Sequence, residues 1–281
     1  MVSTKKAKLY GDIFAYVILI ICSLIFILPL VWMLLTSLKS YDENISFIPT
    51  FLPQKLMFEN YRVALFEFIP YFKYFTNSIF LVVVGTFATV ITATIVAYGF
   101  SRFKVKENNF FFMILLGTMM LPPQVTMISS YVIWAKLYLV NTYVPLLIGC
   151  FFGGSAFYIF LAKQFISGLP IDYEEAAQID GANKLQIFFK IIIPLLKPLI
   201  AAISIFSFQS IWNDYMGPLI YIKDVNLYTV AQSLTLFDMP HETLWGEMMA
   251  ASLVTILPIV IIFAFFQKYF ISGITLGGVK G

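Results

Sequence analysis

Charged residues are scarce in this sequence, and histidine and cysteine are nearly absent. Only 12% of the 281 residues are charged, and there is a single histidine, His241. One histidine excludes the HExxH zinc motif and any His-rich metal cluster, and it argues against a Ser–His–Asp triad. The GxxxxGK[ST] phosphate-binding loop is also missing, so the chain does not bind ATP in that way. The two cysteines, Cys22 and Cys150, lie in apolar runs and indicate no disulfide framework.

Long apolar runs occupy most of the chain. The hydrophobic fraction is 60%, and about 20 consecutive apolar residues are enough to cross a bilayer. We therefore predict an all-α membrane protein with a single transmembrane domain over residues 1–281. The expected spans are 13–38, 74–101, 108–135, 142–163, 195–222 and 248–268, with a loop at 164–194 and a tail at 269–281. The first run is too long for a signal peptide and lacks a cleavage pattern.

Lys and Arg set the expected orientation because they favour cytoplasmic segments. With six spans and the N-terminus inside, six of the 18 Lys and Arg residues fall outside: Lys39, Lys55, Arg62, Lys73, Lys136 and Lys223. The inner segments hold the other twelve. We therefore expect a multi-pass protein of the cell membrane, with its N- and C-termini in the cytoplasm.

Ionisable residues are missing from the middle of the first four expected spans, and Asp214 in the fifth is the exception. Secondary transporters normally keep such groups in the bundle, and many show a repeated half that is not visible here. A membrane enzyme would need clustered polar residues. The best cluster, Asp238, His241, Glu242 and Glu247, falls in an expected external loop, for which an ordinary solvated loop is the simpler interpretation. We predict that the chain is not an enzyme and that any driving energy enters from a partner.

Small residues and prolines mark two features of the spans. Small residues recur at helical spacing in the second span, at Gly85, Ala88, Thr89, Thr92, Ala93 and Ala97, and in the fourth at Gly149 and Gly153. Such faces favour close helix packing, with pathway lining as the alternative. Pro122 and Pro123 remove amide donors from the third span and predict a kink. Together with Gln124 they are candidates for pathway lining, and a purely structural bend is the alternative.

An acidic stretch, LPIDYEEAAQIDGANK, follows the fourth span at residues 169–184. The pattern predicts a short helix over about 173–180, with Asp172 as N-cap, Glu175 completing a capping box and Gly181 just past the end. Glu174 falls in the first turn, where the helix dipole favours negative charge. Asn183 then starts a second, amphipathic helix. Capping accounts for part of the acid, and an ordinary interfacial hairpin remains open at this point.

The segment EEAAQIDGANKLQIFFKIIIP closely resembles the EAA motif of ABC importer permeases. The motif runs Glu-Ala-Ala, three residues, Gly, nine residues, Ile, one residue, Leu-Pro. The matching positions here are Glu175, Ala176, Ala177, Gly181, Ile191 and Pro194, and the one departure is Ile193 in place of Leu. Three other segments, FIPTFLPQKLMFENYRVAL, WNDYMGPLI and FISGITLGGVKG, are similar to regions of the carbohydrate-uptake, maltose-type second permease.

The resemblance implies a type I importer bundle of six transmembrane helices with a cytoplasmic coupling helix. By this resemblance the chain would form the pathway for a sugar together with a second permease, two ATP-binding subunits and an extracytoplasmic solute-binding protein, in a lipid bilayer and without nucleic acid. No cofactor would be held by this chain, because ATP and Mg would bind to the partners. The coupling residues would be Glu174, Glu175, Ala176, Ala177, Asp180 and Gly181, and the tail residues Gly277, Gly278, Val279, Lys280 and Gly281 would contact the ATPase.

The substrate is less well defined by the sequence. Trp212, Asn213, Asp214 and Tyr215 combine aromatic faces with hydrogen-bonding groups that suit a sugar, and an interfacial aromatic anchor is the alternative. Asp214 either holds an outer gate or touches substrate hydroxyls. Because the family also includes importers of glycerol phosphates, a non-sugar solute is the second possibility, and a secondary transporter is the third.

Overall fold

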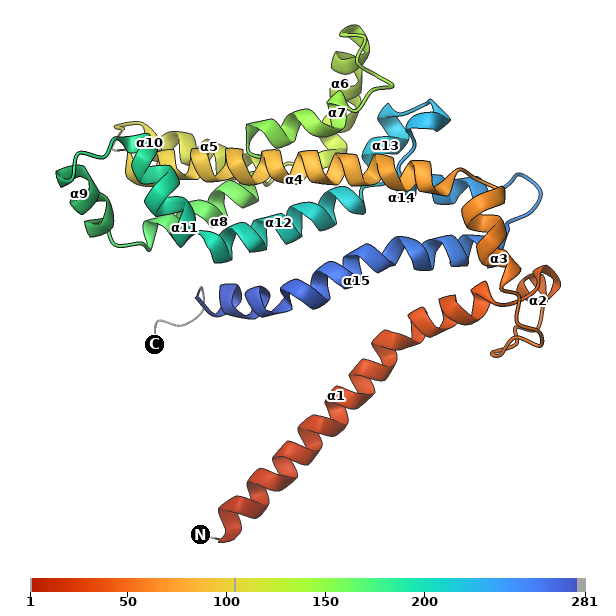
Figure 1. The fold of residues 1–281 in the computed structure, drawn as a ribbon. Helices are drawn as coiled ribbons and strands as arrows, with labels where there is room; N and C mark the ends of the chain where they lie inside the picture. Colours follow the sequence, from red (N-terminus) through yellow and green to blue (C-terminus); the bar gives the residue numbers. More distant parts are fainter. Residues whose placement is uncertain (1, 104, 277–281) are drawn as a thin grey trace. The chain divides into compact units, whose positions relative to one another are not determined.

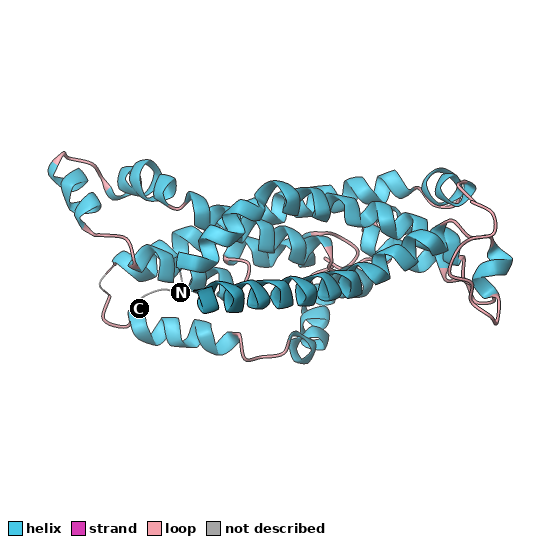
Figure 2. Cartoon of the chain, turned by 90° about the horizontal axis from the view of Figure 1, so that it is seen from below, coloured by secondary structure: helices cyan, strands magenta, loops and turns pink. Residues whose placement is uncertain are grey.

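The computed structural model describes residues 2–103 and 105–276, so the expected tail contacts at Gly277–Gly281 lie outside the described residues. Within those two ranges all regular structure is helical, apart from one isolated bridge between Asp238 and Thr243 (Figure 2). Four helices are long and apolar enough to cross a membrane, or up to six if each of two bent helix pairs is one span. The prediction of an all-α membrane protein is therefore confirmed.

The chain divides into two compact units, Met1–Tyr71 with Ser233–Ile256, and Phe72–Gln232 with Leu257–Gly281. The helices of the first unit are α1 (Val2–Ser37), α2 (Tyr41–Ile45), α3 (Glu59–Arg62), η1 (Val63–Glu67), η5 (Leu234–Phe237) and the first part of α15 (Trp245–Leu276). Those of the second are α4 (Tyr71–Arg102), α5 (Asn108–Thr118), α6 (Pro123–Lys136), α7 (Val144–Leu147), η2 (Ile148–Phe152), α8 (Ala156–Ser167), α9 (Asp172–Ile179), α10 (Lys184–Ile187), η3 (Phe188–Ile192), α11 (Ile193–Leu195), α12 (Lys197–Trp212), α13 (Met216–Tyr221), η4 (Val225–Leu227) and α14 (Val230–Ser233) (Figure 1).

In the first unit, side chains hold the segment that follows α1. The Asn60 side-chain amide donates to the carbonyl oxygens of Ser37 and Lys39, at 2.9 Å each. The Glu43 carboxylate accepts the backbone N–H groups of Gln54 at 2.7 Å and Ser40 at 3.1 Å. These bonds, that from Gln54 above all, lower the pKa of Glu43 below its ordinary value. The loop is therefore ordered by its own polar groups.

In the second unit, the small face predicted for residues 74–101 packs as expected. Ala93 and Ala97 of α4 have no exposed surface and join a core with Ile159, Ala162 and Ile203 from α8 and α12. Small side chains on α4 allow the other two helices to approach closely. This prediction is confirmed, and it makes α4 the helix around which the second unit packs.

The third and fifth expected spans are not single straight helices. At Pro122 and Pro123 the chain bends by 96° between α5 and α6, which confirms the predicted kink. The segment at 195–222 was expected to be continuous, and this is wrong. Helix α12 ends at Trp212, and α13 begins only at Met216. The helix preceding α12, Lys184–Leu195, meets α12 at 77°.

The fourth expected span is also interrupted. The prediction of one helical face carrying Gly149 and Gly153 is wrong, because Gly153 and Gly154 adopt φ values of +98° and +69° between η2 and α8. Thr92 of α4 bridges this break: its hydroxyl lies 2.8 Å from the Cys150 carbonyl oxygen and accepts the Gly153 N–H at 3.0 Å. In apolar surroundings there is no water to bond these backbone groups, so they need hydrogen-bond partners from the protein.

The two kinds of glycine at positive φ should respond differently to alanine. At Gly181 a Cβ would meet nothing within 4 Å, so Gly181→Ala should cost only the backbone penalty of about 1–2 kcal/mol. At Gly154 a Cβ would lie 2.6 Å from Thr89, which adds about 1–3 kcal/mol of overpacking. Thermal unfolding of the purified protein in detergent should give a lower unfolding temperature for Gly154→Ala than for Gly181→Ala. The control is Gly117→Ala, within α5 and in open space, which should not lower stability. Equal losses at Gly154 and Gly181 would contradict the packing described here.

Candidate functional site

Helix α9 is the acidic helix predicted from the sequence, and it begins one residue earlier than expected. Ile171 is its N-cap residue and makes no side-chain cap, so the prediction of Asp172 as N-cap with Glu175 in a capping box is wrong. The reason is local: Ile171 is already in the right-handed helical region, and its carbonyl accepts the N–H of Glu174 at 2.8 Å. Asp172 is therefore inside the helix, where its side chain cannot cap.

The end of α9 and the start of α10 follow the predictions. Gly181 has φ +83° and donates its N–H to the Gln178 carbonyl at 3.0 Å, while Ala182 donates to the Ala177 carbonyl at 2.9 Å. This pair of bonds is a Schellman motif, which glycine permits at low cost. Asn183 and Gln186 then form a full capping box for α10. The glycine turn between two helices is thus fixed by hydrogen bonds on both sides.

The side chains of α9 divide into a buried and an exposed set. Glu175, Ala176 and Asp180 are exposed, while Glu174 is only 2% exposed and Ala177 only 9%. Of the two alanines named as coupling residues, Ala176 is exposed, whereas Ala177 packs into the core of the second unit. The exposed surface of α9 therefore consists of acidic, amide and apolar groups: Asp172, Tyr173, Glu175, Ala176, Gln178, Ile179 and Asp180.

Glu174 has partners within the chain. Its carboxylate forms an ion pair with the Arg102 guanidinium and accepts the Tyr98 hydroxyl, so it is not available at the surface. The sequence placed Glu174 among the coupling residues on the strength of the motif, and the structure places its side chain against the end of α4. Of the two adjacent glutamates, only Glu175 presents its carboxylate to solvent.

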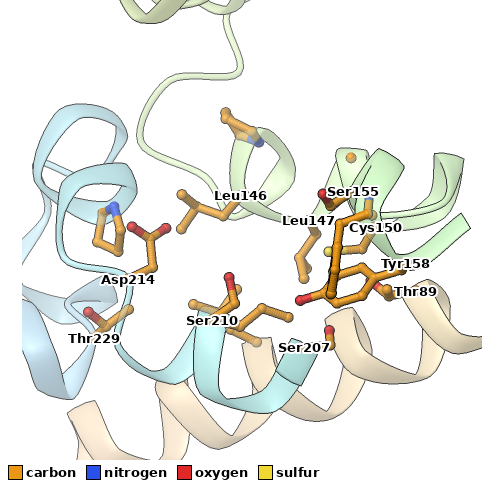
Figure 3. Close-up of a pocket in the computed structure, with 17 residues that line it drawn as sticks. Thr89, Leu146, Leu147, Cys150, Ser155, Tyr158, Ser207, Ser210, Asp214 and Thr229 are labelled. Carbon is orange, nitrogen blue, oxygen red and sulfur yellow. Dashed lines mark hydrogen bonds between the residues drawn. The ribbon is translucent and has the colours of Figure 1, made fainter. Parts of the chain in front are cut away.

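A pocket of about 490 Å³, lined by both polar and apolar residues and called the polar pocket below, lies in the second unit. It is bordered by α4, by the break before α8 and by the end of α12 (Figure 3). Polar side chains line it, namely Thr89, Ser155, Tyr158, Ser207, Ser210, Asp214 and Thr229. Figure 3 shows Asp214 at one end of the pocket and Tyr158 and Thr89 at the other. A hydroxyl-rich pocket of this kind suits a solute that offers many hydrogen-bonding groups.

Asp214 occupies the break between α12 and α13. Its carboxylate accepts the Gly217 N–H at 3.0 Å, so it caps the short helix α13 from the position before the N-cap residue, Tyr215. A Cβ at Gly217 would lie 2.4 Å from the Asp214 carboxylate, which shows how closely the backbone approaches this group. The predicted acid in the fifth span is therefore both a structural cap and a wall of the pocket.

The other predicted pathway residues are dispersed. Trp212 is 2% exposed and packs against Phe75 and Phe208, with ring centroids 5.5 and 5.7 Å away, so its contacts are those of a core residue. Asn213 and Tyr215 are exposed on either side of Asp214. The bend residues Pro122, Pro123 and Gln124 are exposed and do not line the pocket described above.

Sequence reasoning missed the hydroxyl groups of the pocket. Ser207, Ser210 and Asp214 fall at i, i+3 and i+7, and this polar stripe on a mostly apolar helix was the available signal. Tyr158 of α8 and Ser210 of α12 line the same pocket, and spacing along the chain does not indicate this proximity.

Comparison with known proteins gives consistent matches. Residues 85–276 match the family described as binding-protein-dependent transport system inner membrane component. The arabinooligosaccharides transport system permease protein AraQ of Halalkalibacterium halodurans is 33% identical over 259 residues, 91% of each chain. The melibiose/raffinose/stachyose import permease protein MelC of Bacillus subtilis is 33% identical over 258 residues, 90% of this chain and 91% of that protein. A chain in the crystal structure of a bacterial ABC transporter that imports the acidic polysaccharide alginate superposes with a TM-score of 0.82 and 26% identity, covering 94% of this chain and 97% of that one.

The capping role of Asp214 leads to a testable difference between two substitutions. Asp214→Asn keeps an acceptor for the Gly217 N–H and should unfold close to the wild-type temperature. Asp214→Leu removes the cap and should lose about 1 kcal/mol of stability. Thermal unfolding in detergent checks this, with Asp172→Leu as the control, since Asp172 is exposed and forms no cap. If Asp214→Leu is as stable as the control, Asp214 does not hold α13.

Proposed function

Because this chain belongs to the binding-protein-dependent transport system inner membrane component family, as a permease of the sugar ABC transporter type, we propose that it imports a neutral oligosaccharide as one of two permeases in a complex. Two ATP-binding subunits hold ATP and Mg and supply the energy. An extracytoplasmic binding protein delivers the solute. The chain itself performs no chemistry, and its N- and C-termini lie in the cytoplasm.

The polar pocket is the observation that carries the choice of substrate class. Hydroxyl groups from α4, α8 and α12 form part of the lining of a volume of about 490 Å³, beside apolar residues such as Leu146 and Ile211. A sugar can exchange its bonds to water for bonds to these groups, and the tyrosine ring of Tyr158 offers an apolar face. We assign this pocket to the solute pathway.

Charge in the pocket favours a neutral solute over a glycerol phosphate or an acidic sugar. None of the described residues that line it is Lys, Arg or His, and one of them is Asp214. A phosphate would therefore enter without a basic partner and beside a carboxylate, which is unfavourable away from water. A single carboxylate also gives little support to a proton-coupled secondary transporter.

The exposed part of α9 is the proposed contact with the ATP-binding subunit. Glu175 and Asp180 offer carboxylates to basic or amide groups, and Ala176 leaves room for a close approach. Because Gly181 fixes the turn to α10, this exposed surface is held at a defined angle to the rest of the second unit.

Transport by a reconstituted complex tests the proposal. The chain would be co-purified with its partner permease, ATPase and binding protein, and placed in liposomes. Uptake of radiolabelled arabino-oligosaccharides, raffinose and stachyose should require both ATP and the binding protein. Glycerol 3-phosphate and an alginate oligosaccharide should compete poorly. Uptake driven by a proton gradient without ATP would reject the importer, and selective uptake of glycerol 3-phosphate would reject the neutral substrate.

Glu175 should be needed for coupling and not for folding. Glu175→Ala truncates an exposed side chain, so the protein should insert and unfold normally. Loss of a desolvated charged contact costs about 2 kcal/mol or more, so ATP-dependent uptake should fall at least about tenfold. Co-purification of the ATPase should weaken in parallel. The matched control is Glu107→Ala, an exposed acid outside α9. Normal uptake by the Glu175 variant would remove this residue from the contact.

A further inference from the structure

A buried polar cluster joins α9 to the C-terminal end of α4. The Arg102 Nε lies 2.5 Å from one carboxylate oxygen of Glu174, and the Tyr98 hydroxyl donates to the other at 2.9 Å. The side chains of Arg102 and Glu174 are 11% and 3% exposed. Separating the two side chains would leave each with an uncompensated buried charge, which is energetically costly. The contact between Arg102 and Glu174 therefore stays closed while the two helices stay packed, and it ties them together.

Arg102 also binds the segment of chain that leads into α9. Its Nη2 donates to the carbonyl oxygen of Leu169 at 2.9 Å, just before the helix. The Tyr98 ring lies against Phe188, with ring centroids 5.1 Å apart, and Ala177 packs into the same core. Helix α9 is therefore fixed to α4 at its entry, at its first turn and along its buried side.

The other end of this connection reaches the polar pocket. Helix α4 contains no proline and continues without interruption from Arg102 back to Thr92 and Thr89, a distance of about 15–20 Å along its axis. Thr89 lines the pocket, and Thr92 holds the break beside Cys150. A displacement of α9 is thus transmitted to the pocket wall by one rigid helix.

We propose that the Glu174–Arg102–Tyr98 cluster is the joint that transmits movement of α9 through α4 to the solute pocket. This inference rests on the proposed function, in which a partner moves α9. Glu174 is then a positioning residue and Glu175 is a docking residue. The two adjacent glutamates, which look equivalent in the sequence, therefore differ: Glu174 is on the buried side of the helix and Glu175 on the exposed side.

Cys150 provides a reporter for the joint because it borders the pocket and is only 9% exposed, so its labelling rate depends on how open the pocket is. The assembled complex would carry Cys22→Ser, so that Cys150 is the one cysteine left in this chain, and the partner subunits would be cysteine-free. N-Ethylmaleimide labelling of Cys150 would be timed without nucleotide and after trapping with ATP and vanadate. In the wild-type background the two rates should differ at least about fivefold, the lower end of typical coupling between sites.

Glu174→Gln keeps the shape of the side chain and removes its charge. It should reduce the nucleotide-dependent difference in labelling to less than about twofold, while the assembled complex still hydrolyses ATP. Tyr98→Phe removes one hydrogen bond and keeps the ring contacts, so the difference between its two labelling rates should lie between those of the wild type and Glu174→Gln. If Glu174→Gln fails to assemble, the Tyr98→Phe result tests the joint in its place. The matched control, Glu107→Gln, alters an exposed acid next to the same end of α4 and should respond like the wild type.

The outcomes separate the joint from the function on which it rests. A wild-type complex that responds, together with a Glu174→Gln complex that has lost its response but retains ATPase activity, supports the joint. Variants that respond as strongly as the wild type overturn the joint and leave the proposed function intact. If the labelling rate of Cys150 in the wild-type complex is the same with and without nucleotide, the proposed pathway is overturned, and the joint with it.

Discussion

Backbone amides and carbonyls have no water to bond in the interior of a bilayer, so every break in a membrane helix needs partners from the protein. This constraint explains the arrangement of polar groups in the second unit. The break before α8 is satisfied by Thr92, and the break after α12 by Asp214. Both breaks border the same pocket. Asp214, which satisfies one of these breaks, is therefore also one of the polar groups that line the pocket.

Local patterns in the sequence were enough to predict the helical membrane fold and the two helices around Gly181. Apolar runs, a capping box at Asn183 and a glycine at positive φ are all determined by neighbours in the chain. The burial of Glu174 and Trp212 was not, because each depends on a contact from elsewhere in the chain. Glu174 turns toward Arg102, 72 residues away, and this sets the rotation of α9. Trp212 is buried by Phe75 of α4.

The pocket was the least predictable part for a similar reason. Its hydroxyl groups come from separate helices, and no single stretch of sequence contains more than a few of them. Gly149 and Gly153 looked like a helix-packing face, since glycine supports both close approach and left-handed backbone. The close contact between Gly154 and Thr89 shows which of these two roles glycine has here, and this contact exists only in the folded chain.

The two sides of α9 answer to different constraints. The buried side, with Glu174 and Ala177, must match the permease's own interior, while the exposed side, with Glu175 and Ile179, faces outward. The buried and the exposed residues are interspersed within the eight residues of α9. The buried residues of α9 are therefore constrained by the core of the chain itself, whereas substitutions at the exposed positions would leave the packing of the helix unchanged.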